Sequence, residues 1–160
     1  MKRLIIMGDS LSATAESLPT FLTGYHLNLL AQGGRKVHEY QPPRDLRKMA
    51  PDDHVVYFLG TGDILTNADA ADTLPYILHH LRQITAQGFN VTLVVPPKFK
   101  IKQFKETNRD HRRMMRAIDL PGVDICDIQW VWDKSRTWDK IHPLPDLSMK
   151  MADYIQECMR

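Results

Sequence analysis

Short runs of apolar residues alternate with longer, more polar segments along the whole chain. Five of these runs are rich in valine, isoleucine or leucine and show little alternation with polar residues: 3–7, 26–31, 54–59, 91–95 and 123–128. Runs of this length and composition are typical of parallel strands that are covered on both faces of a sheet. We therefore expect five buried strands at these positions.

The segments that separate the later runs carry apolar residues at helical spacing. This pattern predicts a helix over 70–87, a second over 104–118 and a last one from about 146 to the end. Strands that alternate with helices predict an α/β fold, a three-layer α/β/α sandwich around a flavodoxin-like five-stranded parallel sheet. The chain has 160 residues and no internal repeat or low-complexity linker, so we expect a single domain over 1–160.

Loops of small residues follow the first three predicted strands. They read Gly-Asp-Ser at 8–10, Gln-Gly-Gly at 32–34 and Gly-Thr-Gly-Asp at 60–63. Asp139 and His142 follow the fifth strand. Because ligands bind where loops leave the carboxyl ends of parallel strands, these segments are expected to line a single crevice.

A serine, a histidine and an aspartate in one crevice are the three groups that a serine hydrolase needs. His142 can accept the Ser10 proton at neutral pH, and Asp139 can hold the other ring nitrogen. Taken separately, Ser10 would be interpreted as a helix N-cap, and Asp139 with His142 as a polar surface loop. The two segments together favour a catalytic site.

These segments resemble the SGNH hydrolases, also called the GDSL esterase/lipase family, in the family's order over nearly the whole chain. Gly-Asp-Ser-Leu at 8–11 matches the first block, and Asp139, His142 and Pro143 match the Asp-x-x-His-Pro block. The resemblance implies the SGNH hydrolase fold and a serine esterase that cleaves acyl or acetyl esters through an acyl-enzyme on Ser10. It implies neither a metal nor an organic cofactor, and a small-molecule, lipid or carbohydrate ester as the substrate.

One block departs from the family pattern. The third block is usually Gly-x-Asn-Asp, whereas this chain has glycine at position 62 in place of the asparagine. By the resemblance, the backbone amides of Ser10 and Gly34 and that asparagine side chain would bind the oxyanion. Loss of one oxyanion donor typically costs about 10²–10³ in turnover.

Three consequences of this departure stay open. The enzyme is slow, Asn67 or Thr61 replaces the missing donor, or the chain is a relative that binds without turnover. If a slow enzyme lacks only this group, Gly62→Asn should raise turnover.

The segment 98–116 is strongly basic, with eight lysines and arginines against Glu106 and Asp110, and it includes Phe99 and Phe104. The favoured interpretation is a solvated loop and helix face. A surface for nucleic acid or for an anionic membrane is the weaker alternative, and cations beside the crevice that favour an anionic substrate are a third.

Three tryptophans, Trp130, Trp132 and Trp138, precede Asp139. They could wall a pocket for an acyl chain or a sugar, but core and rim packing is the favoured interpretation.

Other features narrow the function classes. Cys126 and Cys158 are expected to be reduced thiols. The basic start is followed by too few apolar residues for a signal-peptide core, and no stretch is long enough to span a membrane, so a cytoplasmic location is expected. Gly60 and Gly62 do not extend into a dinucleotide fingerprint, and His79 and His80 lack a third metal ligand. The pattern does not indicate an oligomeric state.

Overall fold

A single parallel sheet of five strands forms the centre of the computed structural model, which describes residues 2–13, 18–48 and 50–159. The strands are β1 (Lys2–Gly8), β2 (Tyr25–Ala31), β3 (His54–Phe58), β4 (Asn90–Val95) and β5 (Val123–Asp127). They are ordered β2-β1-β3-β4-β5, and all neighbouring pairs are parallel. The predicted fold class is confirmed.

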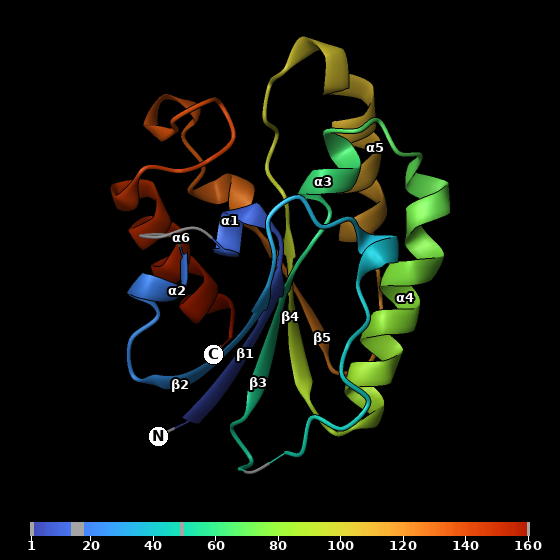
Figure 1. The fold of residues 1–160 in the computed structure, drawn as a ribbon, viewed down its shortest axis with the longest axis vertical. Helices are drawn as coiled ribbons and strands as arrows, with labels where there is room; N and C mark the ends of the chain where they lie inside the picture. The colour runs from blue at the N-terminus through green and yellow to red at the C-terminus, as the bar shows by residue number, and fades with distance from the viewer. Residues whose placement is uncertain (1, 14–17, 49, 160) are drawn as a thin grey trace.

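Helices cover both faces of this sheet (Figure 1). One face carries α4 (Ala70–Ala86) and α5 (Lys105–Arg116), and the other carries α1 (Ser10–Ala13), α2 (Leu18–Phe21) and α6 (Pro145–Cys158). The short helix α3 (Thr61–Ile64) follows β3 directly, and four 3-10 turns complete the connections: η1 (Val37–Glu39), η2 (Lys102–Phe104), η3 (Ile128–Trp130) and η4 (Lys134–Arg136). Within the described residues, no helix is long and apolar enough to cross a membrane.

The central strand β1 shows how the sheet divides the core. Ile5 and Met7 belong to the apolar cluster on the α4 side, and Leu4 and Ile6 belong to the cluster on the α6 side. All four side chains are fully buried. Successive side chains of a strand point to opposite faces, so a strand covered by helices on both sides must be apolar throughout.

The prediction of burial on both faces is wrong for β2. This strand is at the edge of the sheet, with β1 on one side only. Leu27 and Leu29 are exposed to 40% and 44%. An apolar run therefore located the strand correctly, but it did not distinguish an edge position from a central one.

The prediction of two reduced cysteines is also wrong, because Cys126 and Cys158 form a disulfide. Cys126 points into the core from β5, and Cys158 is the last residue of α6. Their Cα atoms are 5.8 Å apart, a separation that a disulfide spans readily. The bond fastens the end of the last helix to an edge strand of the sheet.

Candidate active site

Ser10 begins α1 two residues after the end of β1, at the carboxyl edge of the sheet. The turn that presents it requires glycine at position 8. A Cβ atom there would lie 2.9 Å from Ser12 Oγ and 3.2 Å from the carbonyl oxygen of Phe58. The tight approach of β3 and α1 thus explains why the strand ends in glycine.

Ser10 and His142 meet although 132 residues separate them. Ser10 Oγ lies 3.1 Å from His142 Nε2, and His142 Nδ1 lies 2.6 Å from Asp139 Oδ2. An ionised carboxylate can only accept a hydrogen bond, so Nδ1 carries the proton of the neutral ring. That tautomer leaves the lone pair of Nε2 facing the serine hydroxyl.

Asp139 organises its own loop. Its Oδ1 accepts hydrogen bonds from the backbone N–H groups of Ile141, at 3.0 Å, and of His142, at 2.8 Å. Partial burial acts to raise the pKa of Asp139, but the hydrogen bonds from the His142 backbone and ring and from Ile141 outweigh it and hold the pKa below its usual value. The carboxylate is therefore charged at neutral pH, as required to stabilise an imidazolium.

The backbone around this loop is closed and bent. Trp138 N–H donates to the carbonyl oxygen of His142 at 2.8 Å, beside a bridge between Thr137 and Pro143. Lys140, at the tip, has a φ of 74°, a left-handed conformation that non-glycine residues adopt at some cost. This conformation turns the chain so that both Oδ1 contacts of Asp139 form.

The loop between β2 and η1 passes beside Ser10. A Cβ atom on Gly33 would lie 3.9 Å from Ser10 Cβ. Gly34 has a φ of 70° and lies in a turn in which Arg35 N–H donates to the carbonyl oxygen of Gln32. The first three loops and the Asp139 loop therefore converge as the topology predicted, with the α3 loop joined through its contacts with Asp9 and Arg35.

Gly62 has a steric explanation. A Cβ atom at this position would lie only 2.9 Å from the carbonyl oxygen of Arg35. The backbone cannot change conformation as easily as a flexible side chain does. Any side chain at position 62 therefore requires the loop that carries Arg35, or α3 itself, to move. This overlap argues against the expectation that Gly62→Asn simply restores a missing donor.

The two residues considered as replacement donors have other contacts. Asn67, which has a φ of 55°, accepts a hydrogen bond at its Oδ1 from Thr107 on α5, at 2.8 Å. Thr61 is buried, and its N–H donates to Asp9 Oδ2 at 3.2 Å. Among the described contacts, none brings either side chain to Ser10.

Asp9 is a residue whose importance the sequence did not reveal. It is 1% exposed and accepts hydrogen bonds from the N–H groups of Leu11 and Thr61, each at 3.2 Å. Burial, only partly offset by these hydrogen bonds, raises its pKa to about 7. Asp9 thus joins the nucleophile turn to the start of α3, and its place immediately before Ser10 was the available signal.

Asp63, within α3, has a similar structural role. Its Oδ2 accepts a hydrogen bond from Val37 N–H at 3.0 Å, which ties α3 to the end of the loop that carries Gly34. Burial raises the pKa of Asp63 although this bond and the nearby His111 oppose it. This contact fixes the position of α3 relative to the loop that carries Gly34.

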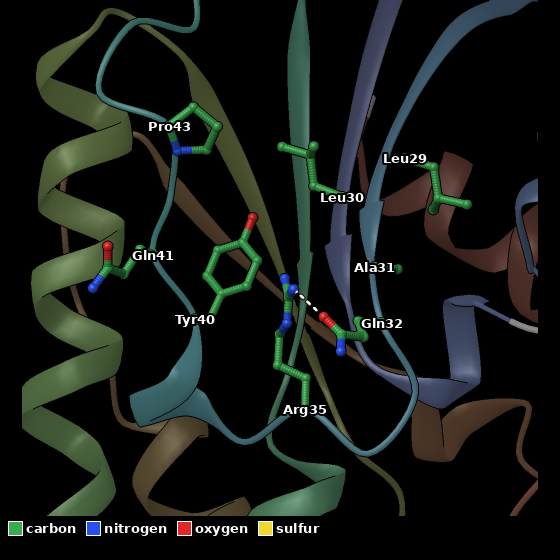
Figure 2. A pocket seen from close by; sticks show the side chains of 8 residues that line it. All are labelled: Leu29, Leu30, Ala31, Gln32, Arg35, Tyr40, Gln41 and Pro43. Carbon is green, nitrogen blue, oxygen red and sulfur yellow. Dashed lines mark hydrogen bonds between the residues drawn. The ribbon is translucent and has the colours of Figure 1, made fainter.

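A hollow of about 350 Å³ lies between the end of β2 and the segment 40–43 (Figure 2). It is walled by Arg35 and Tyr40, whose guanidinium and ring centre are 4.9 Å apart, and by the end of β2. Ser10 does not line it. This hollow is separate from the cluster around the serine.

The three tryptophans differ in their surroundings. Trp132 packs edge-on against Phe99, with ring centres 5.6 Å apart, as the packing interpretation predicts. Trp130 and Trp138 are instead 81% and 73% exposed, so that interpretation is wrong for both. Trp138 is adjacent to Asp139, which places an open aromatic surface beside the candidate site.

The residues that the structure describes do not form a recognisable metal-binding site. No group of three or more histidine, cysteine, aspartate or glutamate side chains is arranged there to hold an ion.

Comparisons with known proteins give a result only at the level of structure. No protein-family model matches the sequence, and no curated protein matches it either. Solved structures do match. A lipolytic protein of the G-D-S-L family from Veillonella parvula superposes with a TM-score of 0.79 at 13% identity, over 98% of this chain and 97% of that one.

Two further structures show the same likeness. A GDSL-like lipase from Bacteroides thetaiotaomicron has a TM-score of 0.80 at 16% identity, with 99% of this chain and 87% of that chain covered. A catalytic serine-to-alanine mutant of an acetylxylan esterase from Geobacillus stearothermophilus has a TM-score of 0.76 at 11% identity, with 99% and 94% covered. The architecture of this chain is that of these proteins.

Proposed function

Because the chain has the SGNH hydrolase fold, with esterases and lipases among its structural neighbours, we propose that it is a serine esterase that hydrolyses a carboxylic ester. The observation that carries the proposal is the hydrogen-bonded line from Ser10 Oγ through His142 to Asp139. This side-chain geometry supports the proposal independently of the backbone superposition.

In the proposed reaction, Ser10 Oγ attacks the ester carbonyl while His142 Nε2 takes the hydroxyl proton. Asp139 holds the ring in position and stabilises the imidazolium that forms. His142 then gives the proton to the departing alkoxide, which leaves an acyl group on Ser10. A water molecule, deprotonated by the same nitrogen, attacks the acyl carbon and releases the acid and the free serine.

The oxyanion would be bound by backbone N–H groups, those of Ser10 and Gly34. As the first residue of α1, Ser10 has an N–H group without a partner inside the helix. With no side-chain donor at position 62, turnover is expected to be lower than with a full set of donors, by about 10²–10³. Substrates with activated leaving groups would be the least affected, because their tetrahedral intermediate forms more easily.

A second candidate function is a binding protein on the same fold that no longer turns over substrate. Gly62 is the observation that favours it, because the family's side-chain donor is absent there. The two candidates differ in whether Ser10 is an activated nucleophile.

That difference can be measured directly. The folded protein is treated with a fluorophosphonate and its intact mass is recorded, beside a Ser10→Ala variant and a Ser12→Ala variant. Ser12 is a matched control because it lies in the same short helix but is fully buried. We expect one adduct in the wild type and in Ser12→Ala, and none in Ser10→Ala.

Hydrolysis of p-nitrophenyl acetate by the same three proteins completes the test. Activity that disappears with Ser10 supports the esterase. A folded wild type that neither forms an adduct nor hydrolyses the ester would refute it and leave the binding protein.

A further inference from the structure

A second cavity, of about 430 Å³, lies against α5 and the connection between β4 and α5. Its lining consists of five cationic residues and one alanine: Lys98, Arg109, Arg112, Arg113, Arg116 and Ala117. Among the described residues, no acidic side chain lines it. The candidate active site uses none of these residues.

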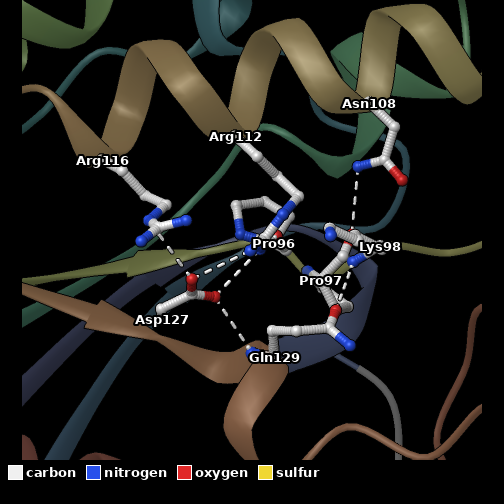
Figure 3. Close-up of polar contacts among 8 residues, drawn as sticks. All are labelled: Pro96, Pro97, Lys98, Asn108, Arg112, Arg116, Asp127 and Gln129. Atoms are coloured by element: carbon white, nitrogen blue, oxygen red, sulfur yellow. Dashed lines mark hydrogen bonds and ion pairs between the residues drawn. The ribbon is translucent and has the colours of Figure 1, made fainter.

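Arg112, which lines the cavity, belongs to a buried ion pair whose acidic member does not line it (Figure 3). Arg112 is 4% exposed and donates to both carboxylate oxygens of Asp127, each at 2.9 Å, and to the carbonyl oxygen of Pro96 at 2.6 Å. Arg116 approaches the same carboxylate at 3.5 Å. One negative charge therefore serves two guanidinium groups.

The remaining cations exceed the acidic groups near them. Arg109 pairs with Asp110 at 3.3 Å on the open surface. Among the described contacts, Lys98 and Arg113 have no acidic partner, and both side chains are exposed. The cavity therefore carries an excess of positive charge at its rim.

The imbalance is also visible in the whole chain. Residues 98–116 contain eight basic and two acidic residues, a net charge of +6, in a chain whose formal net charge is +2. The rest of the chain therefore carries −4. A local excess of positive charge attracts anions, and the attraction weakens with salt.

Stabilisation of the helix end does not explain the whole arrangement. Arg113 and Arg116 lie in the last turn of α5, where cations favour the helix dipole. Lys98 comes from a different segment, and its backbone N–H is held at the cavity by Gln129 Oε1 at 2.7 Å. Two separate segments thus contribute charge to one space.

We propose that this cavity binds a small phosphorylated ligand that carries at least two negative charges. Guanidinium groups match phosphate oxygens in charge and geometry. A volume of about 430 Å³ falls in the range of small-molecule sites. Of the two phenylalanines in the basic segment, Phe99 is 1% exposed and cannot stack on a base, which weakens the case for single-stranded nucleic acid.

Inorganic tripolyphosphate is a suitable probe. Its binding to the full-length protein is measured by calorimetry at about 50 mM and about 200 mM salt, because ion pairing weakens between these concentrations. The test variant is Lys98→Gln with Arg113→Gln, which leaves the buried Arg112–Asp127 pair intact. The matched control is Arg44→Gln with Arg82→Gln, two exposed arginines outside the cavity.

We expect one site per chain, weaker at the higher salt concentration, and a loss of affinity of about tenfold in the test variant. The control variant and Ser10→Ala should bind as the wild type does, so failure of the esterase proposal would not affect this result. Equal affinity in test and control variants would overturn the proposal. So would an oligothymidylate or phosphatidylglycerol vesicles that bind more tightly than tripolyphosphate and displace it, since the surface would then serve a polymer or a membrane.

Discussion

Replacement of Asp9 with asparagine should change how the stability of the protein depends on pH. Asp9 lies under the nucleophile turn and is 1% exposed. Its pKa is raised from 3.8 to about 7, chiefly by burial. Between these two values the folded protein holds a proton at Asp9 that the unfolded chain has released.

The sign and size of the effect follow from this difference. Where the folded state binds more protons than the unfolded state, the free energy of unfolding falls as the pH rises. The pKa difference of about three units corresponds to roughly 4 kcal/mol, at about 1.4 kcal/mol per unit. The contribution of Asp9 is therefore complete below about pH 4 and is lost as the pH rises to about 7.

The wild type alone would not reveal this effect, because His80 acts in the opposite direction. Burial is the main cause that lowers the pKa of His80 from 6.5 to about 4, so the unfolded chain binds the extra proton there. Stability from this residue rises with pH between about 4 and 6.5. The difference between the wild type and Asp9→Asn cancels the contribution of His80 and isolates Asp9.

Urea unfolding followed by circular dichroism at several pH values between about 4.5 and 8 measures this difference, since the linear extrapolation gives each free energy. The asparagine can accept only one of the two backbone hydrogen bonds, so some loss of stability, about 1–3 kcal/mol, is expected at acid pH. We expect the substitution to become progressively less destabilising as the pH rises, by several kcal/mol in all.

Ser12→Ala is the control, because Ser12 is a buried neighbour that does not titrate in this range. Its effect should be the same at every pH. A difference between the wild type and Asp9→Asn that stays constant with pH, or that grows as the pH rises, would refute the argument that burial keeps this carboxyl protonated.

Three further changes have defined outcomes. The chain has two cysteines, so reduction removes only the Cys126–Cys158 disulfide. The 32-residue separation predicts that the free energy of unfolding, measured in urea, falls by about 4 kcal/mol, and an unchanged midpoint would contradict this prediction. Gly62→Asn should lower stability by about 1–3 kcal/mol through overlap with the Arg35 carbonyl, without a gain in turnover; a faster variant of unchanged melting temperature would show that the loop yields. Asp139→Asn should reduce kcat by about 10⁴, because the amide favours the wrong tautomer of the histidine, although fluorophosphonate should still label the serine slowly. Wild-type turnover in this variant would show that Asp139 has no part in the mechanism.

The sequence predicted the layers of the fold well because local pattern determines them. Continuous apolar runs located all five strands, and helical spacing located the three long helices within a few residues. The edge position of β2 escaped the pattern because an apolar run says nothing about how many neighbours a strand has. The Cys126–Cys158 disulfide escaped it because the contact between β5 and the end of α6 depends on how the chain packs.

The candidate site was predictable for a different reason. Asp139 and His142 lie in one loop, so the hydrogen bonds between them are local. The helix α6, which follows this loop, packs against α2 beside α1, and His142 reaches Ser10 from there. Asp9 was overlooked because an aspartate beside a serine on a turn carries no sign of burial. Only the packing of α3 over the turn shows that its carboxyl is enclosed.

The glycine at position 62 shows where a family pattern alone misleads. Compared with the family pattern, this glycine means that the side-chain donor to the oxyanion is missing, which suggests a loss of esterase activity. In the structure, the Arg35 carbonyl occupies the space into which a side chain would extend, so the loop that carries Gly34 and Arg35 packs against α3 only with glycine there. The close approach of Gly62 to the Arg35 carbonyl also packs the Gly34 loop against α3. The hydrogen bond from Val37 N–H to Asp63 holds the same loop in place. Gly62 is therefore evidence about how two loops pack, and the activity of Ser10 has to be judged by labelling the serine itself.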